Sequence, residues 1–252
     1  MKLFNVHIDE ITAREALDML EERQIIFTPN PEILLEARTN KRFMRALKKG
    51  TMMLPDGHGL QFVSLIMRVK LKVLRYFLYL PALILFFIWK KPFSVVFPEI
   101  IHGSDFMAEM VAWASVRGKS VFFLGASDGV AKKVADFFVD RHPDLKVAGS
   151  SSLDPDCSFE AVKRAKPDVL FVAYGAPKQE IWIAEYYKKL PGTHMMGVGG
   201  SFDFWGGQIR RAPVWMRRVG LEWLWRLFLN PRQRLKRIWN AVVVFPLISF
   251  SS

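Results

Sequence analysis

The sequence is poor in cysteine, with only Cys157 among its 252 residues. One cysteine cannot form an intramolecular disulfide, so a small secreted fold held together by disulfides is excluded. The first ten residues also lack the long apolar run of a signal peptide and include Asp9 and Glu10. We therefore expect a protein of the reducing cytosol that is not exported.

Several motifs of catalysis and metal binding are missing too. The histidines have no paired spacing of the kind that binds zinc, and there is neither a Walker A lysine motif nor a G-x-S-x-G elbow. Asp154-Pro155-Asp156 matches the D-x-D in which many glycosyltransferases hold a metal, but Pro and Asp are also ordinary turn residues. We expect no metal and no cofactor, and a metal-dependent enzyme acting through Asp154 and Asp156 is the alternative.

Acidic residues are absent from residues 57–98 and rare in residues 208–240, where Glu222 is the only one. These segments carry net charges of +6 and +8 in a chain of net charge +12, so the remaining body is at −2. They also hold five of the eight tryptophans: Trp89, Trp215, Trp223, Trp225 and Trp239. Cations and amphipathic aromatics gather at anionic lipid surfaces, although they also suit nucleic acids. Because apolar runs accompany both segments, we expect an anionic membrane surface as partner and no nucleic acid.

Long hydrophobic runs are likewise scarce. The uncharged run at residues 76–89 is interrupted by Pro81 and is shorter than the roughly 20 residues of a membrane-spanning helix. A buried core helix is the simpler interpretation, but basic residues on both sides favour a re-entrant or interfacial hairpin. Near the C-terminus, apolar residues repeat at the spacing of one helix face, which predicts a helix lying on the membrane: Leu235, Ile238, Trp239 and Val242.

Apolar strands alternate with helices through the rest of the chain. We expect strands at residues 3–8, 24–28, 51–54, 120–124, 145–148, 168–173 and 194–198, with helices at 12–20, 31–49 (broken near Asn40), 104–116, 128–140, 159–165 and 178–189. This pattern predicts an α/β, Rossmann-like fold in which helices cover both faces of a mostly parallel sheet. We assign residues 1–212 to the catalytic domain, with an apolar element at about 65–97 that is a candidate for membrane insertion. We expect residues 213–252 to form a C-terminal amphipathic helical membrane appendage.

Ligands of parallel sheets bind at the carboxyl ends of the strands. There, Asp56 in Pro-Asp-Gly-His-Gly is the candidate for acid–base chemistry, because glycines beside it allow a substrate to approach, although a turn aspartate has the same local sequence. His58 either orients Asp56 or caps the next helix. Residues 125–129 join a strand to a helix, so they either receive a phosphate or form a turn capped by Ser127 or Asp128.

Eight motifs follow one another along the chain in a fixed order: Thr28-Pro29-Asn30, Pro55-Asp56-Gly57-His58-Gly59, Gly103-Ser104-Asp105, Phe123-Leu124-Gly125-Ala126, Gly175-Ala176-Pro177-Lys178-Gln179-Glu180, Gly199-Gly200-Ser201-Phe202-Asp203-Phe204, Arg211-Ala212-Pro213 and Gly220-Leu221-Glu222-Trp223. By these motifs the chain resembles the WecG/TagA/CpsF glycosyltransferases, which are glycosyltransferase family 26. The resemblance covers nearly the whole chain apart from residues 65–97.

The resemblance implies an inverting hexosyltransferase of cell-surface polysaccharide biosynthesis that acts without a bound metal. The donor would be a UDP-linked sugar of the N-acetylmannosamine type (N-acetylmannosamine or its uronic acid), and the acceptor an undecaprenyl-diphosphate-linked sugar. The enzyme would be peripheral or monotopic at the cytoplasmic face of the plasma membrane. The resemblance does not decide between a monomer and a homo-oligomer. The alternatives are a metal-dependent glycosyltransferase with another UDP-hexose donor and a non-enzymatic module that binds membrane or nucleic acid.

The resemblance also implies roles for single residues. Asp56 would be the general base, Thr28 and Asn30 would position the acceptor or donor, Gln179 would contact the donor sugar, and the loop at Gly125 would contact the nucleotide. Three arginines of the appendage would stabilise the departing UDP: Arg226, Arg234 and Arg237. The chain differs from the family pattern in three places. It has no arginine just before Gly103, no aromatic residue at 149–158 to stack on uracil, and an inserted apolar element at 65–97.

Overall fold

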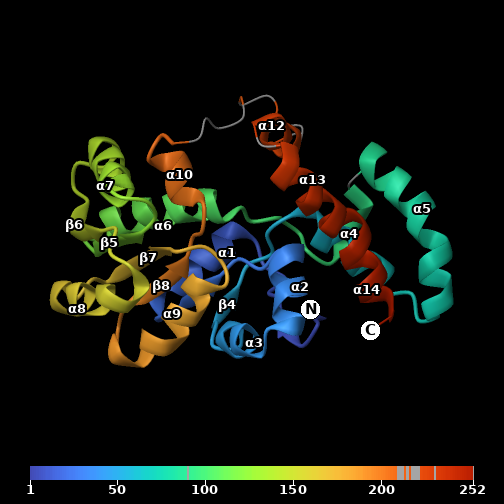
Figure 1. The fold of residues 1–252 in the computed structure, drawn as a ribbon, viewed down its shortest axis with the longest axis horizontal. Coiled ribbons are helices and arrows are strands. Elements are labelled where there is room, and N and C mark those ends of the chain that lie inside the picture. The colour runs from blue at the N-terminus through green and yellow to red at the C-terminus, as the bar shows by residue number, and fades with distance from the viewer. Residues whose placement is uncertain (90, 209–212, 214–215, 217–221, 230, 252) are drawn as a thin grey trace.

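A six-stranded sheet with the strand order β4-β3-β8-β7-β5-β6 forms the centre of the protein, and all of its strand pairs are parallel (Figure 1). The computed structural model describes residues 1–89, 91–208, 213, 216, 222–229 and 231–251, without the side chains of residues 87, 222, 223, 226, 229 and 232–234. The strands are β3 (Ile25–Phe27), β4 (Met52–Met53), β5 (Ser120–Gly125), β6 (Lys146–Ser151), β7 (Val169–Ala173) and β8 (His194–Gly197). The predicted parallel α/β sheet is confirmed.

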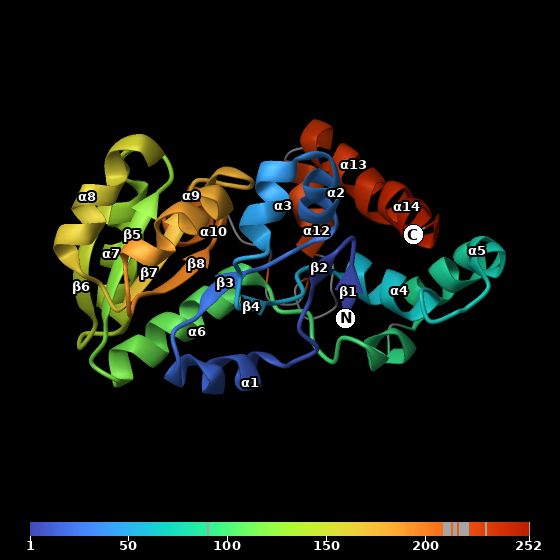
Figure 2. The same ribbon diagram turned by 90° about the horizontal axis from the view of Figure 1, so that it is seen from below.

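Helices cover both faces of this sheet (Figure 2). On one face, α2 (Pro31–Thr39), α3 (Lys41–Leu47), α8 (Pro155–Ala165) and α9 (Lys178–Tyr186) pack in one core with Phe27 and Leu170. On the other face, α1 (Ala13–Asp18), α6 (Gly103–Val116), α7 (Val130–Arg141) and α10 (Ser201–Trp205) pack in a second core with Ile26 and Phe171. Successive strand residues enter opposite cores, as the alternation of side chains in a strand requires.

Local sequence signals set several helix ends. The predicted capping box at Thr12 and Glu15 is present and starts α1, which continues as the 3-10 helix η1 (Met19–Glu21). Asn30 caps α2 ahead of Pro31, and Asn40 ends α2 and caps α3, so the expected break at Asn40 is confirmed. Side-chain caps of this kind satisfy amides that the first helical turn leaves without partners.

The N-terminal strand and some element ends differ from the prediction. In place of one strand at residues 3–8, β1 (Lys2–Leu3) and β2 (Val6–His7) form an antiparallel hairpin. Phe4 and Asn5 at its turn have φ values of 47° and 65°, a left-handed conformation that an extended strand cannot contain. In addition, α8 already begins at Pro155, and α9 ends at Tyr186 and gives way to the 3-10 helix η3 (Tyr187–Lys189).

The remaining helices gather at the end of the molecule opposite β6 (Figure 1). They are α4 (His58–Ile66), α5 (Lys72–Ile88), the 3-10 helix η2 (Lys91–Val95), α12 (Glu222–Leu229), α13 (Pro231–Trp239), the π-helical η4 (Asn240–Val244) and α14 (Phe245–Ser251). The hairpin expected at residues 76–89 is wrong, because α5 continues through Pro81 as one helix. None of the helices in the described ranges is long and apolar enough to cross a membrane. The domain boundary proposed after residue 212 lies outside the described residues, as do most of the motifs at 211–213 and 220–223.

Arg75 links α5 to the C-terminal helix. This residue is 8% exposed, and its guanidinium donates hydrogen bonds to the carbonyls of Val69 (2.8 Å), Phe250 (3.2 Å) and Met67 (3.3 Å). The hydroxyls of Tyr76 and Tyr79 donate to the carbonyls of Leu247 and Val242. The inserted element and the C-terminus are therefore joined by polar bonds within an otherwise apolar contact.

We expect Arg75→Ala to lower the free energy of unfolding by about 1–3 kcal/mol, because buried carbonyl groups lose their donor. Urea unfolding followed by circular dichroism measures this change. Arg68→Ala, which removes an exposed arginine just before α5, serves as the matched control. Equal stability of the two variants would contradict a structural role for Arg75.

Candidate functional site

The loops that follow β3 and β4 are tied to each other and to the start of α6. The amide of Asp56 donates to the carbonyl of Pro29 (3.0 Å), and the amide of Ile101 donates to the carbonyl of Pro55 (2.9 Å). A Cβ atom at Gly103 would lie 3.2 Å from the hydroxyl oxygen of Thr28, a tight contact, so glycine favours this close approach of the helix. The structure thus brings Thr28, Asn30 and Asp56 together at one edge of the sheet.

A histidine contacts the carboxylate of Asp56. The distance from Nδ1 of His102 to Oδ1 of Asp56 is 3.1 Å, and both side chains are partly exposed. His58, which the sequence suggested for this role, bonds to Gln61 Oε1 within its own helix (3.0 Å). Sequence reasoning therefore missed His102. The signal was its place directly before the Gly103 motif, where the loop leads into α6.

Asn30 has a structural task within this cluster. Its Oδ1 accepts hydrogen bonds from the amides of Glu32 and Ile33, each at 3.0 Å. The carbonyl oxygen of the side chain is thereby used to cap α2.

Gln179 joins the loops that follow β7 and β8. Its Oε1 accepts hydrogen bonds from the amides of Gly175 (3.1 Å) and Gly199 (2.8 Å), and its Nε2 donates to Oε1 of Glu180 (2.9 Å). The side chain is 4% exposed. Gln179 therefore shapes two loops at the sheet edge through its carbonyl oxygen, and both of its polar atoms bond to the protein.

Glu180 is a buried acid behind this glutamine. It is 2% exposed, and its Oε2 has no hydrogen-bond partner among the residues that the structure describes. Burial raises the pKa of Glu180 to about 7, against the weaker effect of the bond from Gln179. Below about pH 7 the carboxyl group of Glu180 is therefore neutral, so Gln179 and Glu180 bury no charge.

Gly125 ends β5 in a conformation that favours glycine, with a φ of +101°. A Cβ atom there would lie 3.0 Å from the carbonyl group of Ala173. The following helix α7 has Gly129 as its N-cap and no side-chain cap, so the interpretation in which Ser127 or Asp128 caps it is wrong. Side chains do not cap the first amides of α7, and such amides attract anions.

Tyr174 is an aromatic residue at this edge that sequence reasoning missed. Its ring would lie 3.0 Å from a Cβ at Gly125, and its hydroxyl donates to the carbonyl of Leu153 (2.7 Å). Burial raises the pKa of Tyr174 to about 12, so the phenol stays neutral. The strand end of β7 thus supplies an aromatic next to residues 149–158, which contain none.

The C-terminal helices pack onto the loops that carry Asp56 and Asn30. Arg237 forms an ion pair with Glu32 in the first turn of α2 (3.0 Å). A Cβ at Gly59 would lie 3.3 Å from the carbonyl oxygen of Ala241 in η4. Of the three arginines proposed for the leaving group, Arg237 therefore lies beside the site. The side chains of Arg226 and Arg234 lie outside the described residues.

The pairing of β3 with β8 connects the two groups of loops. Ile26 lies opposite Met196 in this parallel pair. Thr28 directly follows β3 and Val198 directly follows β8, so both lie at the carboxyl ends of these paired strands. Asp56 and Thr28 therefore share one edge with Gly199, Gln179 and the loop at Gly125, as expected for the carboxyl ends of parallel strands.

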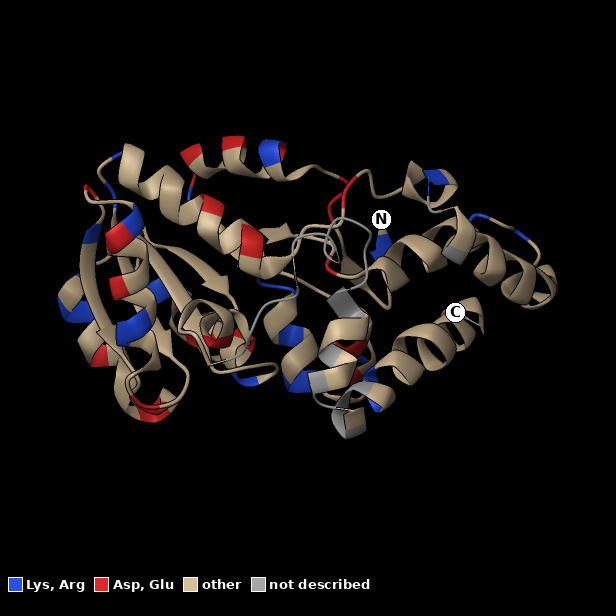
Figure 3. Cartoon of the chain, turned by 90° about the horizontal axis from the view of Figure 1, so that it is seen from above, with Lys and Arg blue, Asp and Glu red and all other residues tan. Residues whose placement is uncertain are grey.

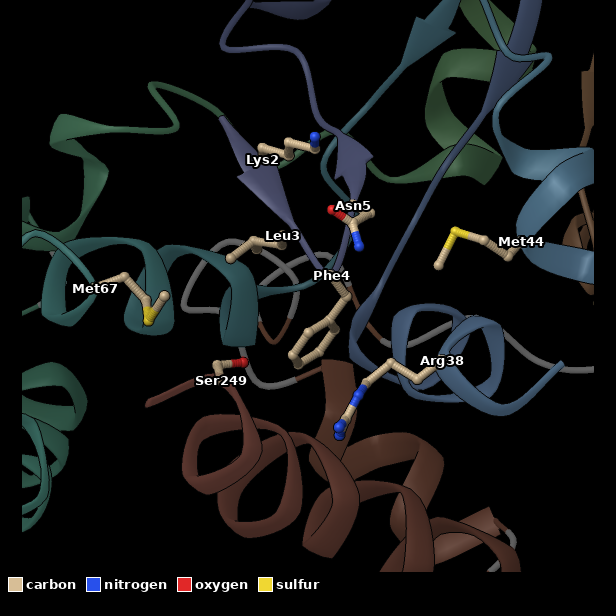
Figure 4. Close-up of a pocket in the computed structure, with 8 residues that line it drawn as sticks. All are labelled: Lys2, Leu3, Phe4, Asn5, Arg38, Met44, Met67 and Ser249. Atoms are coloured by element: carbon tan, nitrogen blue, oxygen red, sulfur yellow. The ribbon is translucent and has the colours of Figure 1, made fainter. Parts of the chain in front are cut away.

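A cavity of about 520 Å³ lies away from these residues, between the N-terminal hairpin and α14 (Figure 4). Arg38 stacks on Phe4 in its wall (5.0 Å), and none of the predicted site residues lines it. A smaller cavity of about 190 Å³ borders His102. The described residues hold no group of three or more His, Cys, Asp or Glu side chains arranged for a metal, and Asp154 and Asp156 flank Pro155 in the start of α8.

A family model described as "Glycosyl transferase WecG/TagA/CpsF family" matches residues 1–86 and 82–251. A protein of Bacillus subtilis (strain 168) is 32% identical over 210 residues, which cover 82% of this chain and 72% of the relative. A protein of Bacillus spizizenii is 30% identical over 88% of this chain and 75% of its own length, and one of Staphylococcus aureus (strain NCTC 8325) is 29% identical over 84% and 76%. Each is named N-acetylglucosaminyldiphosphoundecaprenol N-acetyl-beta-D-mannosaminyltransferase.

The raised pKa of Glu180 predicts a pH dependence of stability. The folded protein keeps this proton up to about pH 7, whereas the unfolded chain releases it near 4.5. The folded state then binds more protons between these values, so the free energy of unfolding falls as the pH rises from about 4.5 to about 7. Glu180→Gln, which mimics the neutral acid, should remove this fall, on the order of 1–3 kcal/mol.

Urea unfolding of both proteins at about pH 5 and about pH 8 tests this difference. The variant should gain stability relative to the wild type at the higher pH. Glu185→Gln on the same helix is the control, because its side chain is 51% exposed. A parallel pH dependence of wild type and Glu180→Gln would show that Glu180 ionises as an ordinary carboxyl group.

Proposed function

The chain belongs to the glycosyl transferase WecG/TagA/CpsF family, and on that premise we propose that it transfers N-acetylmannosamine from UDP to N-acetylglucosaminyldiphosphoundecaprenol. The relatives that carry this activity in their names match most of the chain. The observation that carries the proposal within the site is the Asp56 carboxylate at the end of β4, beside Thr28, Asn30 and His102.

Asp56 is the base in this reaction. It removes the proton from the acceptor hydroxyl, whose oxygen attacks the anomeric carbon of the donor sugar while the bond from that carbon to the UDP oxygen breaks. Attack opposite the leaving group inverts the anomeric centre. His102 is a positioning residue, since a ring nitrogen 3.1 Å from Oδ1 restricts the rotation of the carboxylate.

The donor occupies the neighbouring strand ends. The uncapped amides at the start of α7 suit a phosphate, and the ring of Tyr174 beside Gly125 offers a surface for the uracil base. The loops held by Gln179 lie between this region and Asp56. Arg237, with Arg226 and Arg234, supplies positive charge to the departing diphosphate, which a reaction without a metal requires.

The acceptor is attached to a membrane lipid, so the enzyme works at a membrane surface. We assign it to the cytoplasmic face, where UDP-sugars are available. The basic, tryptophan-containing segments suit the anionic lipids of that face.

Asp56→Asn should retain the fold and lose transfer activity by roughly 10²–10⁴-fold, because the amide cannot accept the proton. The measurement is the product mass after incubation with UDP-N-acetylmannosamine and a short-chain polyprenyl-diphosphate N-acetylglucosamine. Asp140→Asn, at an exposed position on α7, is the control and should keep full activity. Wild-type turnover in Asp56→Asn would remove this carboxylate from the mechanism.

UDP should raise the melting temperature, because a ligand that binds only the native state stabilises it by about 2.7 kcal/mol at a concentration 100 times its Kd. Tyr174→Leu should reduce the shift produced by UDP and leave the shift produced by pyrophosphate unchanged. The absence of any UDP shift would favour the non-enzymatic binding module.

The same assay distinguishes the metal-dependent alternative from transfer without a metal. Transfer and the UDP shift should both survive EDTA. Activity that disappears with EDTA and returns with magnesium would instead favour a metal-dependent transferase, and Asp154→Asn/Asp156→Asn would then identify the ligands.

A further inference from the structure

Helix α5 exposes one continuous apolar stripe. Its five members follow one another at i, i+4, i+7, i+11 and i+15, and each is more than half exposed: Val73 70%, Phe77 75%, Leu80 61%, Ile84 55% and Ile88 79%. Leu74 and Leu85 widen the same face, and Trp89 (56%) follows the helix. A contiguous apolar surface of this kind on a folded protein marks a place where something binds.

The opposite side of α5 is fixed to the protein. Arg75 and Phe86 are buried, and Tyr79 stacks edge-on against Phe62 and Phe250. The helix spans 17 residues and is thus about 25 Å long. Since its inward side is held along this length, α5 can present only its outer stripe to a partner.

The charges around the stripe are of one sign. Arg68, Lys70 and Lys72 lie at the start of α5 and Lys91 lies beyond its end, all of them exposed. Residues 57–98 contain no acidic residue, and Figure 3 shows no red on the α5 ribbon or on the loop before it. A partner of complementary chemistry is therefore apolar at its centre and anionic at its edge.

A second copy of the chain fits these charges poorly. A symmetric pair of α5 helices would bring the same basic residues of both copies near each other, with no acidic residue in the segment to balance them. A bilayer with anionic head groups has both an apolar interior and an anionic surface. Its head groups pair with the lysines and the arginine, and its acyl region receives the stripe.

We infer that α5 is an in-plane membrane-docking helix, which enters the head-group region of an anionic bilayer with the stripe Val73, Phe77, Leu80, Ile84 and Ile88. This inference deepens the proposed function. It rests on that function because the lipid-linked acceptor is the reason that the enzyme needs a membrane. It names the surface that meets the lipid and the chemistry of that lipid.

The docking helix is joined to the reaction site by ring contacts. Phe86 of α5 lies edge-on to His58 (6.3 Å between centroids), and His58 lies edge-on to His102 (6.4 Å). His102 in turn contacts Asp56. The C-terminal end of the docking helix therefore lies two rings away from the carboxylate, and an acceptor anchored in the same bilayer arrives at that end.

Vesicle co-sedimentation of the full chain tests the inference. Wild type should bind phosphatidylcholine vesicles that contain phosphatidylglycerol, and bind them more weakly at high salt. Phe77→Ser/Ile84→Ser should lower the partition coefficient by at least about tenfold, because two large side chains no longer enter the apolar layer. Val116→Ser/Val139→Ser, which changes two exposed valines of α6 and α7, is the matched control and should bind like wild type.

A polarity-sensitive fluorophore gives a second readout that does not depend on loss of binding. In a Cys157→Ser background, the label is attached at Leu80→Cys or, as control, at Val116→Cys. Its emission should shift to the blue on vesicles at position 80 and stay unchanged at position 116.

Equal vesicle binding by the stripe variant and wild type, or an unshifted label at position 80, would overturn the inference. So would a wild-type dimer in solution that the stripe variant converts to a monomer, because a second copy would then cover α5. Transfer to a soluble acceptor analogue separates the two proposals. The stripe variant should retain it, whereas a wild type that binds vesicles without transferring sugar would refute the proposed function and leave the docking surface standing.

Discussion

The pairing of β8 between β3 and β7 is the interaction on which the site depends. β3 and β4 come from the first quarter of the chain, and β5, β6 and β7 come from its later part. Within the sheet these groups meet through β8, which follows all of them in sequence. Without that strand, the loop of Asp56 and the loops of Gly125 and Gln179 would have no common edge.

The side chain of Gln179 lies close to the end of β8, and this close approach explains the residues found there. Gly197 ends the strand, and a Cβ there would lie 3.0 Å from Nε2 of Gln179. The strand therefore ends in glycine so that the glutamine can lie across it and accept from Gly199. Glu180 completes this arrangement from behind, because its carboxyl oxygen Oε1 accepts a hydrogen bond from the amide nitrogen of Gln179 and fixes which end of that amide faces the loops.

The sequence predicted the sheet well because the inner strands β3, β7 and β8 are apolar and buried on both faces, and because side-chain caps mark the starts of α1, α2 and α3. It failed at the N-terminal hairpin, since nothing in the alternation of residues 3–8 indicates left-handed backbone at Phe4 and Asn5. The sequence predicted the part of the site that lies at the ends of the strands. His102 and Tyr174 were missed for the same reason: their neighbours, Asp56 and Gly125, are 46 and 49 residues away along the chain, and only the fold brings them together.

Helix α4 sets the position of the apolar stripe of α5 relative to Asp56. Its first turn carries Gly59, against which Ala241 of η4 packs, and begins two residues after Asp56. Its next turn carries Phe62, which packs against Phe86 of α5 and Phe93 of η2. One buried helix thus contacts the sheet edge, the inserted element and the C-terminus. Because packed interiors resist deformation, the distance from the stripe of α5 to Asp56 is set by α4. The depth at which α5 enters a bilayer would then fix the height of the carboxylate above the lipid, and with it the reach required of the acceptor's diphosphate-linked sugar.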